Sequence, residues 1–281
     1  MRVALTGSNG FTGQYVINSL VKQGIECLPI QADLTDSAAL EREIADTPFD
    51  RLIHLAGQAF VGVDEWESFY NVNQLGTFRL LEAVARYRPG ARCLLASSAQ
   101  IYGPSAKGIV REDDPGNPAN HYAISKYAME LGSALWTDRL DIVLLRPFNY
   151  TGRDQSTQYL LPKIVDHFRR RVDVIELGNV WVKRDFGDVR AVADAYTGLV
   201  LAENAPRVVN VATGREWTIG DIIAILSDLS GHKIEVRVNS ELVRVGDAPT
   251  LSGDVSILRT ALPDWQPREL SDTLQWMLEG R

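Results

Sequence analysis

A tyrosine and a lysine four residues apart, Tyr122 and Lys126, have the side chains of a proton-transfer site. This spacing is about one helical turn, so both side chains would lie on one face of a helix. A phenol in water has a pKa of about 10, and a lysine ammonium within a few ångströms would favour the phenolate and lower that pKa. The pair therefore predicts a tyrosine that acts as a general acid or base near neutral pH, although Tyr and Lys at this spacing also occur on ordinary helix surfaces.

A serine at the end of a predicted strand strengthens this interpretation. Ser98 follows the apolar run Leu95-Ala96-Ser97, and the carboxyl ends of strands in open α/β sheets face the crevice where ligands bind. Its hydroxyl could donate a hydrogen bond to a substrate carbonyl. A role as nucleophile is not expected, because no Gly-x-Ser-x-Gly turn surrounds it.

Three glycines, Gly7, Gly10 and Gly13, come directly after the first predicted strand and open the first predicted helix. Glycine permits a tight turn and close approach of the backbone to a pyrophosphate, and the helix N-terminus offers N–H groups to the anion. In the first strand–helix unit of an α/β chain, this spacing indicates a dinucleotide site rather than an ordinary glycine-rich turn.

The acidic residue expected about 20 positions further on is Asp33. It would bind the adenosine ribose, or contact adenine if it lies past the second strand, or only begin the next helix. No basic residue adjoins Gln31, so a clamp for a 2′-phosphate is not evident. The choice between NAD and NADP stays open.

Short apolar runs alternate with helical patterns through the first two thirds of the chain, which predicts a parallel, doubly wound α/β sheet. The strands are expected at 3–6, 27–30, 52–56, 93–97, 142–146 and 208–212, covered on both faces. The helices are expected at 10–23, 38–45, 72–87 and 121–137, and in the third of these Leu75, Phe78, Leu81 and Ala85 form one apolar stripe.

The pattern loosens beyond Asn149, where helices at 160–171 and 218–230 flank a basic and aromatic stretch at 181–186. We therefore expect a dinucleotide-binding Rossmann domain over 1–149, to which 183–213 returns. A smaller mixed α/β substrate domain is expected over 150–281.

The composition agrees with a soluble globular protein of the cytoplasm. The chain has 281 residues, 45% of them hydrophobic and 23% charged, and a net charge of −7, which argues against an extended nucleic-acid surface. The first residues form no long apolar segment, and the longest aliphatic run, 222–226, is too short to span a membrane. Cys27 and Cys93 both lie in strand-like runs, so neither a disulfide scaffold nor a metal site is expected.

With the glycine loop, Ser98, Tyr122 and Lys126 in this order, the chain resembles the extended short-chain dehydrogenase/reductase family that modifies nucleotide sugars. The resemblance covers nearly the whole chain. It extends to Arg146-Pro147-Phe148-Asn149, Arg184-Asp185-Phe186 and Gly253-Asp254.

The resemblance implies a role for each matching residue. Ser98 and Tyr122 would be the catalytic hydroxyls, and Lys126 would bind the nicotinamide ribose and tune Tyr122. Asn149, with Arg184 and Arg244, would hold the sugar-nucleotide diphosphate, although the arginines could instead form surface ion pairs. The cofactor would contact Gly7, Asn9, Gly10, Phe11, Thr12, Gly13, Asp33, Leu34, Leu55, Ala56 and Gly57.

Residues 54–58 resemble the strand end on the cofactor side in this family, with Gln58 as a substrate contact. Asn73 resembles the buried polar helix residue of the family. His54 is expected to be a hydrogen-bonded core histidine rather than a catalyst.

The positions after Ser98 bear on the reaction. The 4,6-dehydratases of the family carry an acid pair directly after their catalytic hydroxyl, whereas this chain has Ala99 and Gln100, which disfavours a dehydratase. The chain most resembles the GDP-4-keto-6-deoxy-mannose reductases that form GDP-rhamnose. It departs from them at Gln100 and Ala191, where an acid is usual, and this leaves the sugar open.

We therefore expect NAD(P)H-dependent reduction of the C4 ketone of a nucleotide-diphospho-4-keto-6-deoxyhexose. A nucleotide-sugar 4-epimerase is the alternative, and a cofactor-sensing protein without catalysis is less favoured. The resemblance also implies a homodimer, paired through the helices that carry Tyr122 and Asn73.

Overall fold

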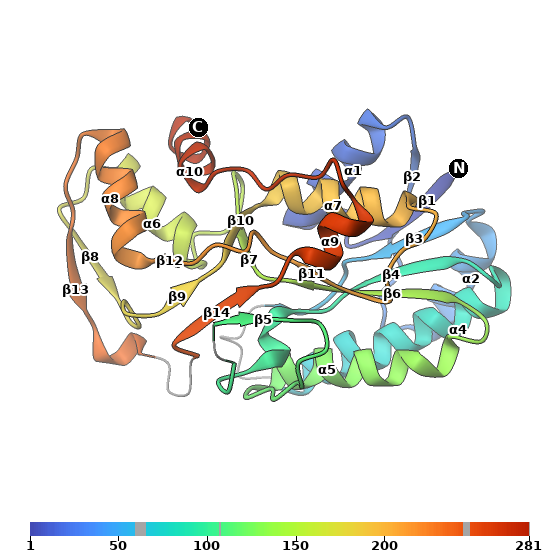
Figure 1. Ribbon diagram of the computed structural model, residues 1–281. Helices are drawn as coiled ribbons and strands as arrows, with labels where there is room; N and C mark the ends of the chain where they lie inside the picture. Colours follow the sequence, from blue (N-terminus) through green and yellow to red (C-terminus); the bar gives the residue numbers. More distant parts are fainter. Residues whose placement is uncertain (60–65, 107, 244–247, 281) are drawn as a thin grey trace.

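A six-stranded parallel sheet forms the centre of the structure, a computed structural model that describes residues 1–59, 66–106, 108–243 and 248–280 (Figure 1). The strand order is β11-β6-β4-β3-β1-β2, and each neighbouring pair is parallel. The strands are β1 (Arg2–Thr6), β2 (Glu26–Ile30), β3 (Arg51–His54), β4 (Arg92–Ala96), β6 (Asp141–Pro147) and β11 (Val208–Val211). The predicted doubly wound sheet is confirmed, with strand ends shifted by one or two residues.

Helices cover both faces of this sheet (Figure 1). Alternate strand residues divide between two apolar cores, with Val3 and Leu5 facing one helix layer and Ala4 facing the other. The first layer holds α1 (Phe11–Lys22) and α7 (Val189–Leu201). The second holds α2 (Ser37–Asp46), α4 (Thr77–Tyr87) and α5 (His121–Ser133).

Strand β2 is less covered than expected because it lies at the edge of the sheet. Only Ile30 of its five residues is buried, and Pro29 is exposed. Proline lacks the N–H that a central strand would need, so an edge is where it is tolerated.

The helix expected at 72–87 is divided in the structure. A short helix, α3 (Glu67–Phe69), leads into a π-helix, η1 (Tyr70–Gly76), before α4 begins. A π-helix has wider turns than an α-helix, so the α-helical spacing does not hold across Leu75. The predicted apolar stripe is wrong at this residue: Leu75 is 45% exposed, whereas Leu81 is fully buried.

Smaller sheets and three helices form the other side of the molecule (Figure 1), where the helices pack around a separate apolar core. The sheets are β10-β7, β12-β9-β14-β5 and β13-β8. Their strands are β5 (Ile109–Val110), β7 (Asn149–Thr151), β8 (Val174–Leu177), β9 (Lys183–Arg184), β10 (Phe186–Asp188), β12 (Trp217–Thr218), β13 (Glu235–Val238) and β14 (Thr250–Gly253). The helices of this core are α6 (Leu160–Arg169), α8 (Ile219–Ser230) and α10 (Leu270–Glu279). The strands β5 and β14 contribute to a further small core beside the turn Ala99–Tyr102.

Short helices complete the chain: the 3₁₀ turns η2 (Ala99–Tyr102), η3 (Ala134–Trp136) and η4 (Ser240–Leu242), and the helix α9 (Ser256–Ala261). Among the described residues, no helix has the length and apolar character needed to cross a membrane.

Candidate active site

The glycine loop between β1 and α1 has the shape of a phosphate cradle. Gly7 has a φ of +71°, and a Cβ added there would lie 2.7 Å from the Ala56 nitrogen. A Cβ on Gly13 would lie 2.2 Å from the Gly7 carbonyl oxygen. No side chain caps the start of α1 at Gly10, so the N–H groups of its first turn remain available to an anion. The loop therefore fits the pyrophosphate of a dinucleotide.

Asp33 lies past the end of β2, and its carboxylate is hydrogen-bonded to the turn that follows. Its exposed carboxylate accepts hydrogen bonds from the Thr35 nitrogen and hydroxyl, both at 2.8 Å. These bonds hold the pKa of Asp33 below its usual range. The capping residue of α2 is Asp36, which accepts from the nitrogens of Ala38 and Ala39.

The structure brings Ser98 and Tyr122 together at the carboxyl end of β4. Ser98 precedes η2, and its hydroxyl accepts a hydrogen bond from the Gln100 nitrogen at 3.2 Å. Tyr122 lies on the first turn of α5, which Asn120 caps by accepting from the Ala123 nitrogen. The hydroxyls of Ser98 and Tyr122 are joined by a hydrogen bond, and both residues are buried.

The expected lowering of the Tyr122 pKa by Lys126 is not what the structure shows. Burial raises the pKa of Tyr122 to about 12, and the hydrogen bond with Ser98 acts in the opposite direction. The Lys126 Nζ donates to the Ala96 carbonyl at 2.7 Å, at the end of β4. Tyr122 therefore carries its proton at neutral pH, as a proton donor must.

Lys126 is buried against the strand ends. Burial lowers the pKa of its ammonium to about 8, while the Glu130 carboxylate raises it. A Cβ on Gly57 would lie 3.2 Å from the Lys126 Nζ and 2.8 Å from the Asn73 Oδ1. Glycine at this position therefore leaves room for both polar side chains beside β3.

Asn73 is fully buried within η1, as expected for a buried polar helix residue. Its Oδ1 accepts from the Gln58 nitrogen at 2.8 Å, and its Nδ2 donates to the Gln58 carbonyl and the Ser125 hydroxyl, both at 3.0 Å. Asn73 thus fixes the segment after β3 to α5, and this contact determines where Gln58 lies.

His54 is a core residue, as expected. Its Nδ1 lies 2.7 Å from the Thr6 hydroxyl and its Nε2 lies 2.9 Å from the Thr77 hydroxyl. Burial, with a contribution from the Lys126 charge, lowers the pKa of His54 to about 3. The neutral ring ties β3 to β1 and α4.

The structure contains a buried ion pair behind the site that the sequence analysis did not predict. Arg146 on β6 binds Glu130 on α5 through two hydrogen bonds of 3.0 and 2.8 Å. Its Nη1 also donates to the Tyr102 hydroxyl in η2 at 2.9 Å, and Tyr102 donates to the Asn210 Oδ1 on β11 at 2.7 Å. One guanidinium therefore joins the helix with Tyr122 to the turn that Ser98 begins. The signal in the sequence was Glu130, one helical turn beyond Lys126.

Tyr150 was also missed, although it adjoins Asn149. Its hydroxyl lies 2.8 Å from the Thr12 hydroxyl, and its ring stacks with Phe11 at 6.2 Å between centroids. The pair connects the first turn of α1 to β7, so the cofactor loop and the predicted substrate strand are in contact.

The predicted substrate residues come from the strands that follow β6. Asn149 is exposed at the start of β7, and its Nδ2 donates to the Asp185 carbonyl at 3.4 Å. Arg184 is nine-tenths buried on β9 and donates to the Lys183 carbonyl at 2.8 Å. Arg244 lies outside the described residues.

Asp185, between Arg184 and β10, is a buried anchor for three segments. Its carboxylate accepts from the nitrogens of Thr213 and Gly214 and from the Ser252 hydroxyl. Burial raises the pKa of Asp185, and the hydrogen bonds from Thr213 and Gly214 act against that shift. Asp185 therefore fixes β9, where Arg184 lies, to the ends of β11 and β14.

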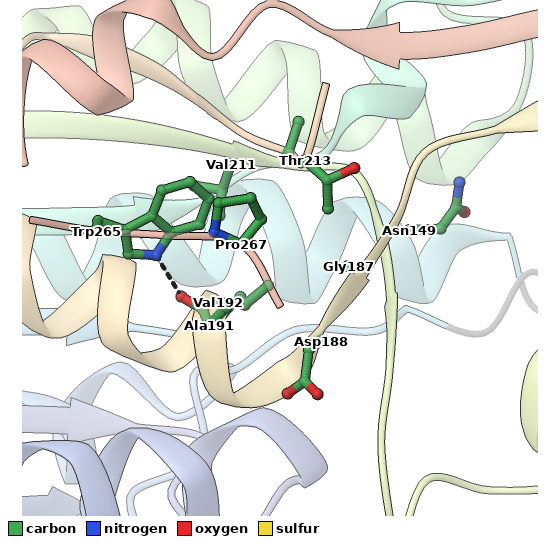
Figure 2. Close-up of a pocket in the computed structure, with 10 residues that line it drawn as sticks. Asn149, Gly187, Asp188, Ala191, Val192, Val211, Thr213, Trp265 and Pro267 are labelled. Atoms are coloured by element: carbon green, nitrogen blue, oxygen red, sulfur yellow. Dashed lines mark hydrogen bonds between the residues drawn. The ribbon is translucent and has the colours of Figure 1, made fainter. Parts of the chain in front are cut away.

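A small pocket adjoins this region, and Figure 2 shows its lining. The Trp265 indole donates to the Ala191 carbonyl at 2.8 Å on one side, and Asn149 and Gly187 lie on the other. Asn149 is the one predicted site residue among its described lining residues. We therefore locate the active site by the chemistry of Ser98, Tyr122 and Lys126 and not by this pocket.

The chain matches a known family over most of its length. Residues 28–277 match the family model described as GDP-mannose 4,6 dehydratase. A GDP-6-deoxy-D-talose 4-dehydrogenase from Aggregatibacter actinomycetemcomitans is 32% identical over 292 aligned residues, which cover 100% of this chain and 98% of the relative.

Two solved structures show the same fold. A putative epimerase from Burkholderia cenocepacia J2315 is 39% identical, with a TM-score of 0.92 over 99% of this chain and 97% of that chain. The structure of RMD from Pseudomonas aeruginosa complexed with NADPH is 28% identical, with a TM-score of 0.89 over 99% and 97%.

Proposed function

The chain belongs to the GDP-mannose 4,6-dehydratase family of extended short-chain dehydrogenases/reductases, and from this premise we propose that it reduces the C4 ketone of a GDP-linked 4-keto-6-deoxyhexose with NAD(P)H. The observation that carries the proposal is the buried, protonated phenol of Tyr122, hydrogen-bonded to Ser98 at the end of β4. The relative that acts at C4 of a GDP-6-deoxyhexose supports the substrate class.

Each side chain of the site has a separate role in the proposed ketone reduction. When bound in the site, the reduced nicotinamide would be the source of the hydride for C4. Ser98 donates a hydrogen bond to the carbonyl oxygen, and Tyr122 protonates that oxygen as negative charge develops on it. Lys126, which stays largely charged below pH 8, stabilises the tyrosinate that remains.

The cofactor and substrate would meet along the carboxyl ends of the strands. We assign the pyrophosphate to the glycine loop and α1, with Leu55, Ala56 and Gly57 beside the nicotinamide end. Asn149, Arg184 and Arg244 are assigned to the diphosphate of the substrate, with Gln58 near the sugar. In this division, residues 1–149 with 183–213 bind the cofactor and 150–281 bind the sugar nucleotide.

A dehydratase is disfavoured despite the description of the family model. The positions that carry the acid pair in the 4,6-dehydratases are Ala99, which is buried, and Gln100, whose amide oxygen accepts a hydrogen bond from Asn120. Neither side chain can supply the carboxylate that elimination of water requires.

The Tyr122→Phe variant tests the proposed proton donor. We expect a loss of turnover of about 10²–10⁴-fold, with dinucleotide binding retained. Tyr127→Phe removes a hydroxyl from the same helix and should leave turnover unchanged. If Tyr122→Phe turns over normally, the assignment is wrong and a cofactor-sensing protein becomes the better interpretation.

A nucleotide-sugar 4-epimerase is the second candidate, because a solved structure at 39% identity is described as a putative epimerase. The two functions differ in redox balance. Incubation with a 4-keto-6-deoxy sugar nucleotide and NAD(P)H should consume one equivalent of reduced cofactor per product. Epimerisation of a 4-hydroxy sugar nucleotide without loss of nicotinamide absorbance would contradict the reductase.

We also propose that the protein is a cytoplasmic homodimer paired through α5, which carries Tyr122, and through η1 with the adjoining α4, where Asn73 lies in η1. Leu75, Ile124, Leu131 and Leu135 are 45%, 38%, 62% and 76% exposed, and the last three lie at helical spacing along α5 and η3. An apolar stripe of this kind marks a protein interface. Both cysteines are unbridged, in keeping with a reducing compartment.

A further inference from the structure

A glutamate side chain from helix α2 lies at the end of strand β2. Glu43, on α2, accepts a hydrogen bond from the Gln31 nitrogen at 2.9 Å through Oε1 and from the Ala32 nitrogen at 2.6 Å through Oε2. The side chain of Gln31 connects to the glycine loop, because its Nε2 donates to the Ser8 hydroxyl at 3.0 Å and its Oε1 accepts from the Asn9 Nδ2 at 3.2 Å. Glu43 is therefore joined to the cofactor loop through one residue.

This place has a defined role in dinucleotide folds. The adenosine ribose lies beyond the second strand, where an acidic residue accepts a hydrogen bond from the 2′-hydroxyl of NAD or an arginine accommodates the 2′-phosphate of NADP. The residue at the strand end here is the neutral Gln31. A carboxylate has about four acceptor positions, so Glu43 can bind the two amides and still accept from a hydroxyl.

Two carboxylates, those of Glu43 and Asp33, lie at the end of β2 and in the segment that follows it. Asp33 has a pKa below its usual range and is ionised at neutral pH. Arg79, the cation that reaches the following turn, donates to the carbonyls of Leu34 and Asn71. Within the described part of the chain, no Lys or Arg forms a hydrogen bond or ion pair with Ser8, Asn9, Gln31, Ala32 or Glu43.

We propose that Glu43 makes the protein selective for NADH over NADPH, an inference that rests on the proposed dinucleotide-dependent function. The carboxylate takes the position of the acid that Gln31 does not supply, and it accepts from the ribose 2′-hydroxyl. A 2′-phosphate, with a charge of about −1.5 to −2 at neutral pH, would instead meet the negative charges of Glu43 and Asp33 without a neutralising cation.

Isothermal titration calorimetry on the full chain, with NADH and NADPH in separate titrations, tests the selectivity without a turnover measurement. We expect NADH to bind at least about tenfold more tightly than NADPH at low ionic strength. The ratio should shrink at about 1 M salt, where the Debye length falls to about 3 Å.

The Glu43→Gln variant keeps the shape of the side chain and removes its charge, so the ratio should fall by about tenfold or more. Glu41→Gln is the matched control. Glu41 lies on the same helix, but its carboxylate accepts from Arg86 and from the Tyr87 hydroxyl at 3.0 Å. The control should keep the wild-type ratio. Gln31→Arg places a cation at the strand end and should raise NADPH affinity even if Glu43→Gln folds poorly.

The other outcomes are distinct. Equal or tighter binding of NADPH by the wild type would overturn the inference and leave the proposed function intact. A preference for NADH that Glu43→Gln leaves unchanged would overturn the role of Glu43. If neither dinucleotide bound to the folded wild type, the proposed function itself would fail and the inference with it.

Discussion

Lys126 shows how a single buried charge serves the reaction at the expense of stability. Its pKa falls from the usual 10.5 to about 8 in the folded chain. Below pH 8 the folded and unfolded states are both protonated, and the destabilisation, about 3 kcal/mol, is fully present. Between pH 8 and 10.5 the unfolded state binds more protons, so this contribution to stability rises with pH and the destabilisation disappears.

Lys126→Met should therefore be more stable than the wild type at pH 7. Loss of the hydrogen bond to Ala96 offsets about 1 kcal/mol, which leaves a gain of about 2 kcal/mol in the free energy of unfolding. The gain should shrink as the pH rises above 8. Urea unfolding at several pH values measures it, with Lys22→Met at an exposed position as the control. A gain that does not change with pH would contradict the assigned shift.

The same residue sets the pH dependence of turnover. Tyr122, with a pKa of about 12, keeps its proton through the neutral range, whereas Lys126 loses charge above about pH 8. The value of kcat/KM for ketone reduction should be level below pH 8 and fall at higher pH. Lys126→Arg, which keeps its charge at any pH in this range, should react more slowly but without that decline. A decline at the same pH in both proteins would assign it to another group.

At the scale of elements, the Arg146–Glu130 pair holds α5 against β6 and η2. Both side chains are buried, at 8% and 3% exposure, and removal of one partner from such a pair costs about 3–5 kcal/mol because the other charge remains unpaired. Arg146→Met should therefore lose stability in this range. The double variant Arg146→Met with Glu130→Leu should recover much of it.

In these variants, the loss of kcat and the loss of stability should not follow one another. The double variant is expected to fold but to keep a reduced kcat, because the Ser98 turn is then joined to the Tyr122 helix by the weaker contact of Asn120 with Gln100 and no longer by the guanidinium. Urea unfolding and steady-state kinetics on both variants measure the two effects. A double variant with wild-type kcat would show that the pair is purely structural.

Local patterns in the sequence predicted what lies close along the chain. The glycine spacing, the Tyr122–Lys126 turn and the apolar strands each depend on neighbouring residues, and the structure has them in place. The pairing of Arg146 with Glu130 and of Glu43 with the end of β2 joins separate elements, and no periodicity reports such contacts. The pKa of Tyr122 is raised, whereas the sequence predicted a lowering, because the fold buries the phenol and the local spacing of Tyr122 and Lys126 does not report burial.

For the whole molecule, the exposed stripe on α5 connects assembly to the active site, since the same helix carries Tyr122 and Lys126 on its buried side. In a dimer, this helix would pack against the same helix of a second copy, and the contact would cover Leu131 and Leu135. A charge placed in the centre of that contact would have to lose its hydration on pairing. Leu131→Glu is therefore expected to be a folded monomer.

Light scattering during size-exclusion chromatography measures the mass of each species. The wild type should elute as a dimer and Leu131→Glu as a monomer. Leu229→Glu, on α8 and 40% exposed, introduces the same charge away from the stripe and should remain a dimer. Because α5 positions the proton donor, turnover should fall in proportion to the fraction of the protein that is monomeric. Addition of excess Leu131→Glu monomer should restore neither the dimer mass nor the rate. A Leu131→Glu dimer of wild-type mass would place the interface elsewhere.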